Sequence, residues 1–221
     1  VFDTIEWHER YILRNEDNKL ILGRGLMGDV IIDIDKTPHI LIGGNTGSGK
    51  SVLVQCLLWQ AIQQADVVYV ADFKGGVDFS YVWQEFAYII TEEKKLLVLL
   101  NHLADILEER KRLFKEVDAA NITEYREKSG DYMQRIVFAC DEVAELLDKT
   151  GADKSRKELL AQIEARLALI ARQGRAFGIH LILATQRPDA NILPGQIKNN
   201  MNIRICGRAD TTLSTIIIGD G

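Results

Sequence analysis

The sequence predicts an α/β fold with a mostly parallel central sheet and helices on both of its faces. Three observations predict it. Short continuous apolar runs alternate with longer segments of helical periodicity. A glycine-rich stretch stands between one such run and a helical segment. Polar residues directly follow several runs, at the edge where such sheets bind ligands. The predicted strands are residues 39–43, 67–71, 135–140, 179–184 and 202–206.

Residues 1–37 predict a small β-rich lead-in segment, and residues 38–221 a single larger domain. The lead-in holds three short apolar runs separated by polar or glycine-containing turns. It carries no recognisable catalytic set. The runs are residues 11–13, 20–22 and 30–34, and the turns are residues 15–18 and 23–29.

Composition limits the functional classes. A chain of 221 residues with 47% hydrophobic residues is globular and large enough for one α/β domain. No apolar run approaches the roughly 20 residues of a membrane span, and no signal peptide is visible. The net charge of −5 argues against a surface coated with nucleic acid. It leaves open contact through a small basic loop, particularly if several copies surround a duplex.

The chain ends suggest an excised domain, truncated at its C-terminus. It begins at Val1 and not at methionine, and it stops at Gly221 just after an apolar run. A membrane anchor elsewhere in the parent protein therefore stays possible. Three widely spaced cysteines in apolar patterns predict buried, reduced thiols of a cytoplasmic protein and no metal site. They are Cys56, Cys140 and Cys206.

The glycine-rich stretch follows the strand at 39–43 and precedes a helical pattern at 52–63. It fits G-x-x-x-x-G-K-[ST], in which glycines let the backbone wrap an anion at a helix N-terminus. Lys50 can reach the β- and γ-phosphates of ATP, and the Ser51 hydroxyl can ligate Mg²⁺. The predicted nucleotide-binding residues are Gly44, Asn45, Thr46, Gly47, Ser48, Gly49, Lys50 and Ser51.

The strand at 67–71 runs into Asp72 and Lys74, which are either residues near the site or a loop ion pair. His39 lies at the start of the first strand. We expect it to have a structural role and not to act as a catalytic base, because phosphate transfer needs no histidine.

The helical segments have recognisable boundaries. Thr91 can cap a long helix over 91–117. Its basic residues at 110–112 and 115 predict a solvated face, with contact to nucleic acid as the alternative. A second long helix over 153–177 ends at Gly178. Shorter helices are predicted over residues 120–130, 194–200 and 210–218.

An acid pair, Asp141 and Glu142, follows the strand at 135–140. Asp141 would hold the hydration shell of Mg²⁺, and Glu142 would polarise the attacking water. Gln186, at the end of the strand at 179–184, would sense the γ-phosphate and orient that water. A glutamate beside a strand-end aspartate, followed by a polar strand end, predicts the RecA-like class of phosphate-loop ATPases.

Over roughly residues 20–221 the chain resembles the motor domain of the FtsK/SpoIIIE family. The resemblance implies a hexameric ring that uses ATP hydrolysis to move a polymer through its pore. For most members the polymer is double-stranded DNA, in chromosome partition or conjugation. The matching segments are TPHILIGGNTGSGKS (37–51), DFKGG (72–76), RIVFACDE (135–142) and, most specifically, ARQGRAFGIHLILATQRP (171–188).

The resemblance also implies residue roles. Arg175 resembles the arginine that the family presents to the ATP of a neighbouring subunit, where it stabilises the charge on the transferred phosphoryl group. Arg172 and Arg208 are the other candidates, and an ordinary helix-surface arginine is the alternative for each. The family's phosphate-loop, metal-binding, water-activating and sensing positions fall on Lys50, Ser51, Asp141, Glu142 and Gln186.

The sequence departs from the DNA motors of the family. It shows neither a winged-helix module nor a membrane segment, and DFKGG replaces the usual D-P-K-G, as in the branch that drives type VII secretion. We expect a DNA translocase that lies in the cytoplasm, on the membrane face if the parent is anchored. A type VII secretion-like ATPase that moves proteins is the first alternative. A non-hydrolysing nucleotide-binding scaffold ranks last, because the full motif set is present.

Overall fold

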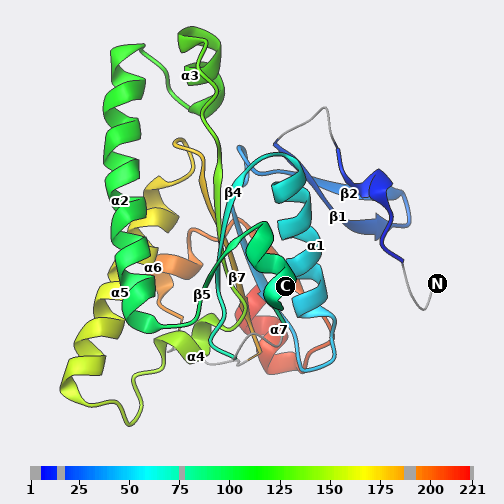
Figure 1. Ribbon diagram of the computed structural model, residues 1–221. Helices are drawn as coiled ribbons and strands as arrows, with labels where there is room; N and C mark the ends of the chain where they lie inside the picture. The colour runs from blue at the N-terminus through cyan, green and yellow to red at the C-terminus, as the bar shows by residue number, and fades with distance from the viewer. Residues whose placement is uncertain (1–5, 14–17, 75–77, 187–192, 220–221) are drawn as a thin grey trace.

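The computed structural model describes residues 6–13, 18–74, 78–186 and 193–219. Its centre is a six-stranded sheet in the order β5-β4-β6-β7-β3-β8, in which every paired strand is parallel (Figure 1). The strands are β3 (His39–Gly43), β4 (Val67–Ala71), β5 (Tyr88–Ile90), β6 (Ile136–Cys140), β7 (Ile179–Thr185) and β8 (Ile203–Cys206).

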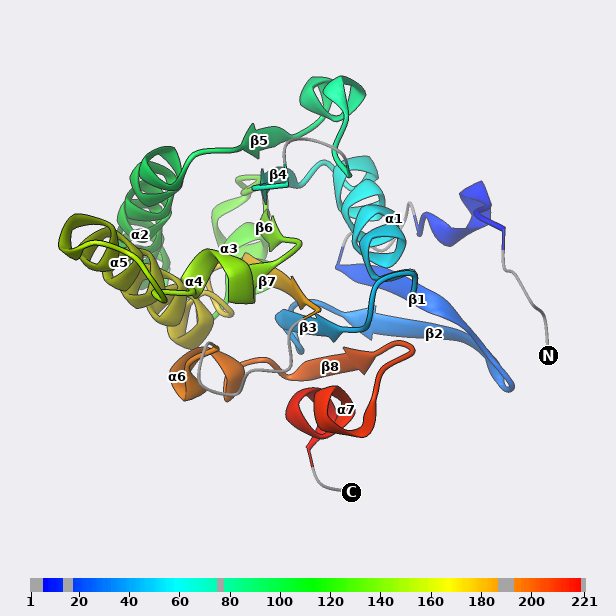
Figure 2. The same ribbon diagram turned by 90° about the horizontal axis from the view of Figure 1, so that it is seen from below.

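Helices cover both faces of this sheet, which confirms the predicted layers. On one face lies α1 (Lys50–Gln63). The long helices α2 and α5 run side by side on the other face, together with three shorter helices (Figures 1 and 2). These are α2 (Glu93–Glu116), α5 (Lys154–Gln173), α4 (Val143–Leu147), α6 (Gly195–Lys198) and α7 (Thr211–Ile218).

The continuous apolar strands follow from this double cover. Side chains alternate between the two faces of a strand, so both sets must be apolar when both faces are buried. In β3, Ile40 and Ile42 pack into the core on the α1 side, whereas Leu41 packs into the core under α2 and α5. A third, smaller cluster joins α3 (Ile122–Ser129) to the end of α2 through Phe114 and Tyr125.

The lead-in forms a separate antiparallel hairpin of β1 (Lys19–Gly25) and β2 (Gly28–Asp33), which rests on α1. The Gln60 side chain of α1 accepts from the Ile21 amide at 2.7 Å and donates to its carbonyl at 3.0 Å. Gln64 Nε2 donates to the Lys19 carbonyl at 2.7 Å. These bonds fix the outer edge of β1 against the helix that follows the phosphate-binding loop.

The lead-in holds fewer strands than its three apolar runs suggest. Residues 11–13 form no strand, because the 3₁₀ helix η1 (Glu9–Tyr11) ends at the first of them. His8 Nδ1 accepts from the Arg10 amide at the start of this helix. The turn expected over 23–29 shortens to Leu26 and Met27, because both strands continue into it. The turn residues 15–17 lie outside the described residues.

Several predicted boundaries need correction. The first turn of α2 follows Glu92 and not Thr91, and no side chain caps it. Helix α5 ends at Gln173, before Gly178, and a turn follows that the Ile179 amide closes by donating to the Gly174 carbonyl at 3.0 Å. The strand β5, the helix α4 and the 3₁₀ helix η2 (Tyr81–Glu85) were not predicted.

One prediction about side-chain exposure is wrong, and another holds for only one of its three residues. Arg110 is buried, not solvated, and it donates to the carbonyls of Phe177 at 2.5 Å and Gln134 at 2.7 Å. Of the three cysteines, Cys140 is fully buried, whereas Cys56 and Cys206 are half-buried. Among the described residues, no helix is both long and apolar enough to cross a bilayer.

Candidate nucleotide-binding site

The strand order brings the predicted site residues together. The neighbouring strands β4, β6, β7 and β3 all end at the same edge of the sheet. Lys74 follows β4, the acid pair follows β6, and Gln186 follows β7. The phosphate loop (residues 44–51) begins after β3 and runs into α1. Four chain segments that are far apart in the sequence therefore meet at one place.

Glycine geometry shapes the phosphate loop. Gly47 and Gly49 have positive φ angles of 77° and 84°, which glycine adopts readily. At Gly44 a Cβ would lie 2.3 Å from Ser48 Oγ and 3.1 Å from Ser48 Cβ, so a larger residue there would displace the Ser48 side chain. The amide of Asn45 donates to the Arg208 carbonyl at 3.0 Å, which holds the loop beside the connection from β8 to α7.

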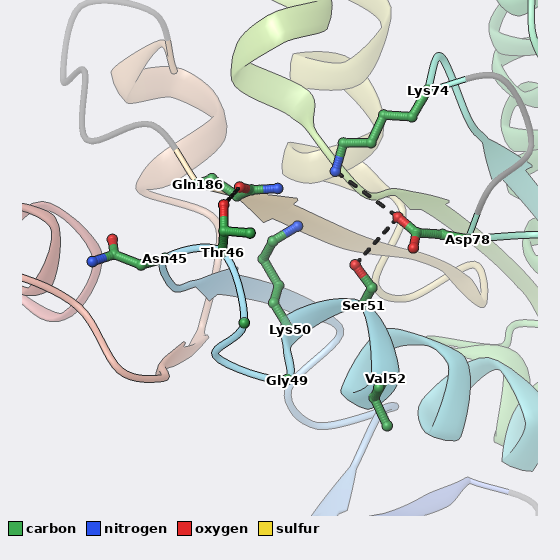
Figure 3. Close-up of a pocket in the computed structure, with 10 residues that line it drawn as sticks. Asn45, Thr46, Gly49, Lys50, Ser51, Val52, Lys74, Asp78 and Gln186 are labelled. Atoms are coloured by element: carbon green, nitrogen blue, oxygen red, sulfur yellow. Dashed lines mark hydrogen bonds and ion pairs between the residues drawn. The ribbon is translucent and has the colours of Figure 1, made fainter.

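The loop borders a pocket of about 320 Å³ (Figure 3). Residues from three of the four segments line it. Side chains from α1, the β4 connection and the end of β7 converge there, whereas Asn45 and Val52 point away from them. The lining residues are Asn45, Thr46, Gly47, Gly49, Lys50, Ser51, Val52, Lys74, Asp78 and Gln186.

Lys50 contacts the strand-end aspartate directly. Its Nζ donates to Oδ1 of Asp141 at 2.9 Å and to the carbonyl of the same residue at 2.7 Å. Both side chains are almost fully buried. Burial alone would raise the pKa of Asp141, but hydrogen bonds from Lys74 and Lys50 outweigh it and lower that pKa. The two lysines therefore favour the ionised form of the Asp141 carboxylate.

Ser51, the last residue of the phosphate-loop motif, stands among carboxylates. Its Oγ lies 3.1 Å from Oδ1 and 3.3 Å from Oδ2 of Asp141, and 3.4 Å from Oδ2 of Asp78. Hydroxyl and carboxylate oxygens are the donors that Mg²⁺ prefers in proteins. The donor set around Ser51 therefore fits this cation.

The Glu142 side chain bonds to the end of β7. Its Oε1 accepts from Thr185 Oγ1 at 2.7 Å, and its Oε2 accepts from the Gln186 amide at 2.8 Å. Glu142 also lines a small cavity of about 10 Å³. Lys74 lines both this cavity and the pocket of about 320 Å³ beside the phosphate loop, which we call the phosphate pocket. The Gln186 side chain turns to the phosphate loop, where its Oε1 accepts from Thr46 Oγ1 at 2.7 Å.

The two alternatives for Asp72 and Lys74 are resolved in favour of the site for Lys74. Oδ1 of Asp72 accepts from the Lys74 backbone amide at 2.9 Å, so the two side chains do not pair. Lys74 Nζ instead lies 2.6 Å from Oδ2 of Asp141. Sequence reasoning missed Asp78, since it stands seven positions after the end of β4 and carries no motif signal. Gly75 and Gly76 of the DFKGG segment lie outside the described residues.

The candidate arginines lie in different places. Arg175 stands in the turn between α5 and β7, so it is not on a helix surface, and its Nε donates to the Asp35 carbonyl at 3.3 Å. That turn is at the start of β7, at the sheet edge opposite the phosphate loop. Arg172 lies in the last turn of α5. Arg208 lies beside the phosphate loop of its own chain. Arg187 and Pro188 lie outside the described residues.

Comparison with known proteins finds the same family that the sequence motifs resemble. The FtsK/SpoIIIE family model matches residues 5–190. The chain is 32% identical to a DNA translocase FtsK from Campylobacter jejuni over 91% of its length, and 32% identical to one from Haemophilus influenzae over 84%. It spans only 22% and 40% of these two relatives.

Solved structures share the fold of this chain. The pCW3 conjugation coupling protein TcpA, in its monomer form with ATPγS, superposes on the whole chain with a TM-score of 0.95 and 40% identity, and 62% of that protein is covered. EssC from Geobacillus thermodenitrificans superposes on 93% of the chain with a TM-score of 0.78 and 21% identity, and 40% of it is covered. At that identity the likeness to EssC concerns the fold alone.

Proposed function

The chain belongs to the FtsK/SpoIIIE family, and from this membership we propose that it is the ATP-hydrolysing motor of a DNA translocase. The observation that carries the proposal is the direct contact of Lys50 and Ser51 with Asp141 beside a pocket of about 320 Å³. The relatives named DNA translocase FtsK and the likeness to a conjugation coupling protein with ATPγS support it.

Phosphate binding would use the loop amides and Lys50. Backbone amides at the start of α1 face an anion favourably because the positive end of the helix dipole lies there. Lys50 would exchange its present bond with Asp141 for the β- and γ-phosphates. Ser51 and Asp141 would hold Mg²⁺, which neutralises charge on the phosphates when it is bound.

Hydrolysis would use Glu142 as the base that takes a proton from the attacking water. The bonds from Thr185 and from the Gln186 amide fix the orientation of its carboxylate. The Gln186 side chain is bonded to Thr46, so a movement of the phosphate loop on nucleotide binding would shift Gln186 and, through its backbone amide, the Glu142 carboxylate.

A second copy of the chain would complete the site. Strand β7 has seven residues, and at roughly 3.3 Å per residue it separates Arg175 from the phosphate loop of its own chain by about 20 Å. Arg175 is exposed, and its Nε donates to the backbone carbonyl of Asp35. The terminal nitrogens of its guanidinium would therefore be available to a neighbouring subunit. A homo-oligomer, with a hexameric ring as its expected form, would place it at the next pocket. Arg172 is the alternative on the same side.

The test is ATP hydrolysis by the parent protein with and without double-stranded DNA, with Lys50→Ala as the control for contaminating ATPases. Stimulation by DNA supports the proposal. A rate indifferent to DNA but raised by a secretion-substrate peptide would assign the chain to protein export. Binding of ATPγS without any hydrolysis would assign it to a scaffold role. The proposed location is the cytoplasm, at the membrane face if the parent protein is anchored there.

A further inference from the structure

Asp78 lies in the phosphate pocket although it belongs to neither nucleotide motif. Its Oδ2 accepts from Ser51 Oγ at 3.4 Å (Figure 3). Its position is held from both sides: Gln55 of α1 donates to its backbone carbonyl, and the adjacent Phe79 is buried in the core on the α1 side. A carboxylate is thus fixed opposite Asp141, across the hydroxyl of Ser51.

An ammonium group already occupies the space between these oxygens. Lys74 Nζ lies 2.6 Å from Oδ2 of Asp141 and 4.0 Å from Oδ2 of Asp78. Lys50 takes the other oxygen of Asp141 at 2.9 Å. Two carboxylates therefore face two ammonium groups. The oxygen donors come from three separate chain segments, which gives a defined position for a positive charge.

We propose that Asp78 is a further ligand of the divalent cation, bound directly or through one water, and that the ammonium of Lys74 holds the cation's position until the cation displaces it. This inference rests on the proposed nucleotide site. Mg²⁺ usually takes one or two carboxylates together with water and phosphate oxygens, and Asp141, Asp78 and Ser51 match that set. The released Lys74 would then face the incoming phosphates.

A purely structural role for Asp78, as an anchor of Lys74, makes a different prediction. If the pair only stabilised the loop, removing either partner would change cation affinity in the same direction. If Asp78 binds the cation and Lys74 competes with it, the two removals act with opposite sign. Asp78→Asn should weaken cation binding, and Lys74→Met should strengthen it.

The experiment measures free Mn²⁺ by electron paramagnetic resonance in titrations of the full chain with saturating ADP, which lacks the γ-phosphate that Lys74 could contact. We expect Asp78→Asn to weaken Mn²⁺ binding by roughly 10-fold, the lower end of the effect of removing a supporting ligand. Lys74→Met should tighten it several-fold. Asp78→Glu should retain more affinity than Asp78→Asn, and the exposed Asp105→Asn, on α2, should match the unmodified chain.

The outcomes separate the two levels of inference. If the unmodified chain binds neither ADP nor ATPγS, the proposed nucleotide site itself is wrong. If it binds Mn²⁺ and ADP while Asp78→Asn keeps the unmodified affinity, Asp78 is not a ligand and the nucleotide site stands. If Lys74→Met weakens Mn²⁺ binding as Asp78→Asn does, Lys74 does not compete with the cation and the pair is structural.

Discussion

The Thr46 hydroxyl donates a 2.7 Å hydrogen bond to Oε1 of Gln186, which links the phosphate loop to the end of β7. The backbone amide of the same glutamine donates to Glu142 at 2.8 Å. Gln186 therefore contacts the loop through its side chain and the acid pair through its backbone. Under the proposed function, a change at the phosphate loop would be transmitted to the Glu142 carboxylate through this single residue.

Gln186→Ala should slow hydrolysis more than it weakens nucleotide binding. The substitution removes the bond to Thr46 but keeps the backbone bond to Glu142. A typical net value of about 1 kcal/mol for a hydrogen bond corresponds to roughly a fivefold loss in kcat. Thr46→Val should act similarly, and Thr46→Ser, which keeps the hydroxyl, should not. Comparing kcat with the Kd for ATPγS checks this. Equal losses in Thr46→Ser and Thr46→Val would refute the hydrogen-bond explanation.

Lys50→Ala should weaken ATPγS binding by roughly 10- to 100-fold, the range expected for loss of hydrogen bonds to a charged group. Lys50 is almost fully buried against Asp141, so no other side chain can take its place easily. Isothermal titration gives the affinity. The matched control is Lys154→Ala, because the side chain of Lys154 is 92% exposed at the start of α5. An unchanged affinity in Lys50→Ala would place phosphate binding elsewhere.

Glu142→Gln should abolish most hydrolysis while nucleotide binding persists. Loss of a positioned general base typically costs roughly 10² to 10⁴ in rate. Glutamine keeps an oxygen that can accept from Thr185 or from the Gln186 amide, so the local structure should survive. The control is Glu145→Gln, since this exposed glutamate lies only three positions away. Full Mg-ATP turnover in Glu142→Gln would rule out the water-activating role.

Mixed subunits test the shared active site. Arg175→Ala and Lys50→Ala chains should each be nearly inactive alone, and mixing them should restore part of the activity. Recovery is expected because some interfaces pair an intact Lys50 with an intact Arg175. Gel filtration must show that mixed oligomers form. If Arg172→Ala gives this recovery and Arg175→Ala does not, the trans role moves to Arg172. No recovery with either variant in verified mixed oligomers would contradict a trans arginine on this turn.

Stability should fall as the pH falls from 7 to 5. Burial, followed by the nearby His180, lowers the pKa of His39 to about 3, and burial, followed by Arg135, lowers that of His180 to about 3. The ordinary value is 6.5. Between about pH 6.5 and about pH 3 the unfolded chain therefore binds protons that the folded chain excludes, so the free energy of unfolding decreases with decreasing pH. Each histidine contributes a slope of up to about 1.4 kcal/mol per pH unit.

Chemical denaturation at several pH values measures this slope. His180→Leu should make this slope shallower, whatever its effect at pH 7. His102→Gln, at an exposed position of α2, is the control variant. The window of pH 7 to 5 lies above the ordinary pKa of aspartate, about 3.9, so most carboxylates do not contribute. An identical slope in His180→Leu would exclude this histidine as a source.

The sequence predicts the elements whose signals are local. Strands β3 and β4 match their predicted bounds, because a strand buried on both faces must be continuously apolar. By contrast, β5 has only three residues, and Tyr88 within it is exposed, so it shows no such pattern. The burial of Arg110 depends on the carbonyls of Gln134 and Phe177, which only the tertiary fold brings near α2.

The same distinction applies to the site. The meeting of Lys50, Ser51 and Asp141 could be predicted from a fixed sequence motif and a strand end, and the structure brings their side chains into contact. Asp78 could not, because its contact with Ser51 depends on how the connection after β4 folds back over α1. The position of Arg175 off the helix follows from the end of α5 at Gln173, where the bond from the Ile179 amide to the Gly174 carbonyl closes a turn between the helix and β7.

The two glutamines of α1 bond to backbone groups on the outer edge of β1, whereas β2 forms the other edge of the hairpin. Gln60 satisfies both backbone groups of Ile21 as a neighbouring strand would, and Gln64 satisfies the Lys19 carbonyl. Within the described part of the chain, β2 pairs with β1 alone, and Val30 and Ile31 on it are exposed. Strand addition by a partner needs unpaired backbone groups, so it can extend this sheet from β2, whereas Lys19 and Ile21 of β1 are already bonded.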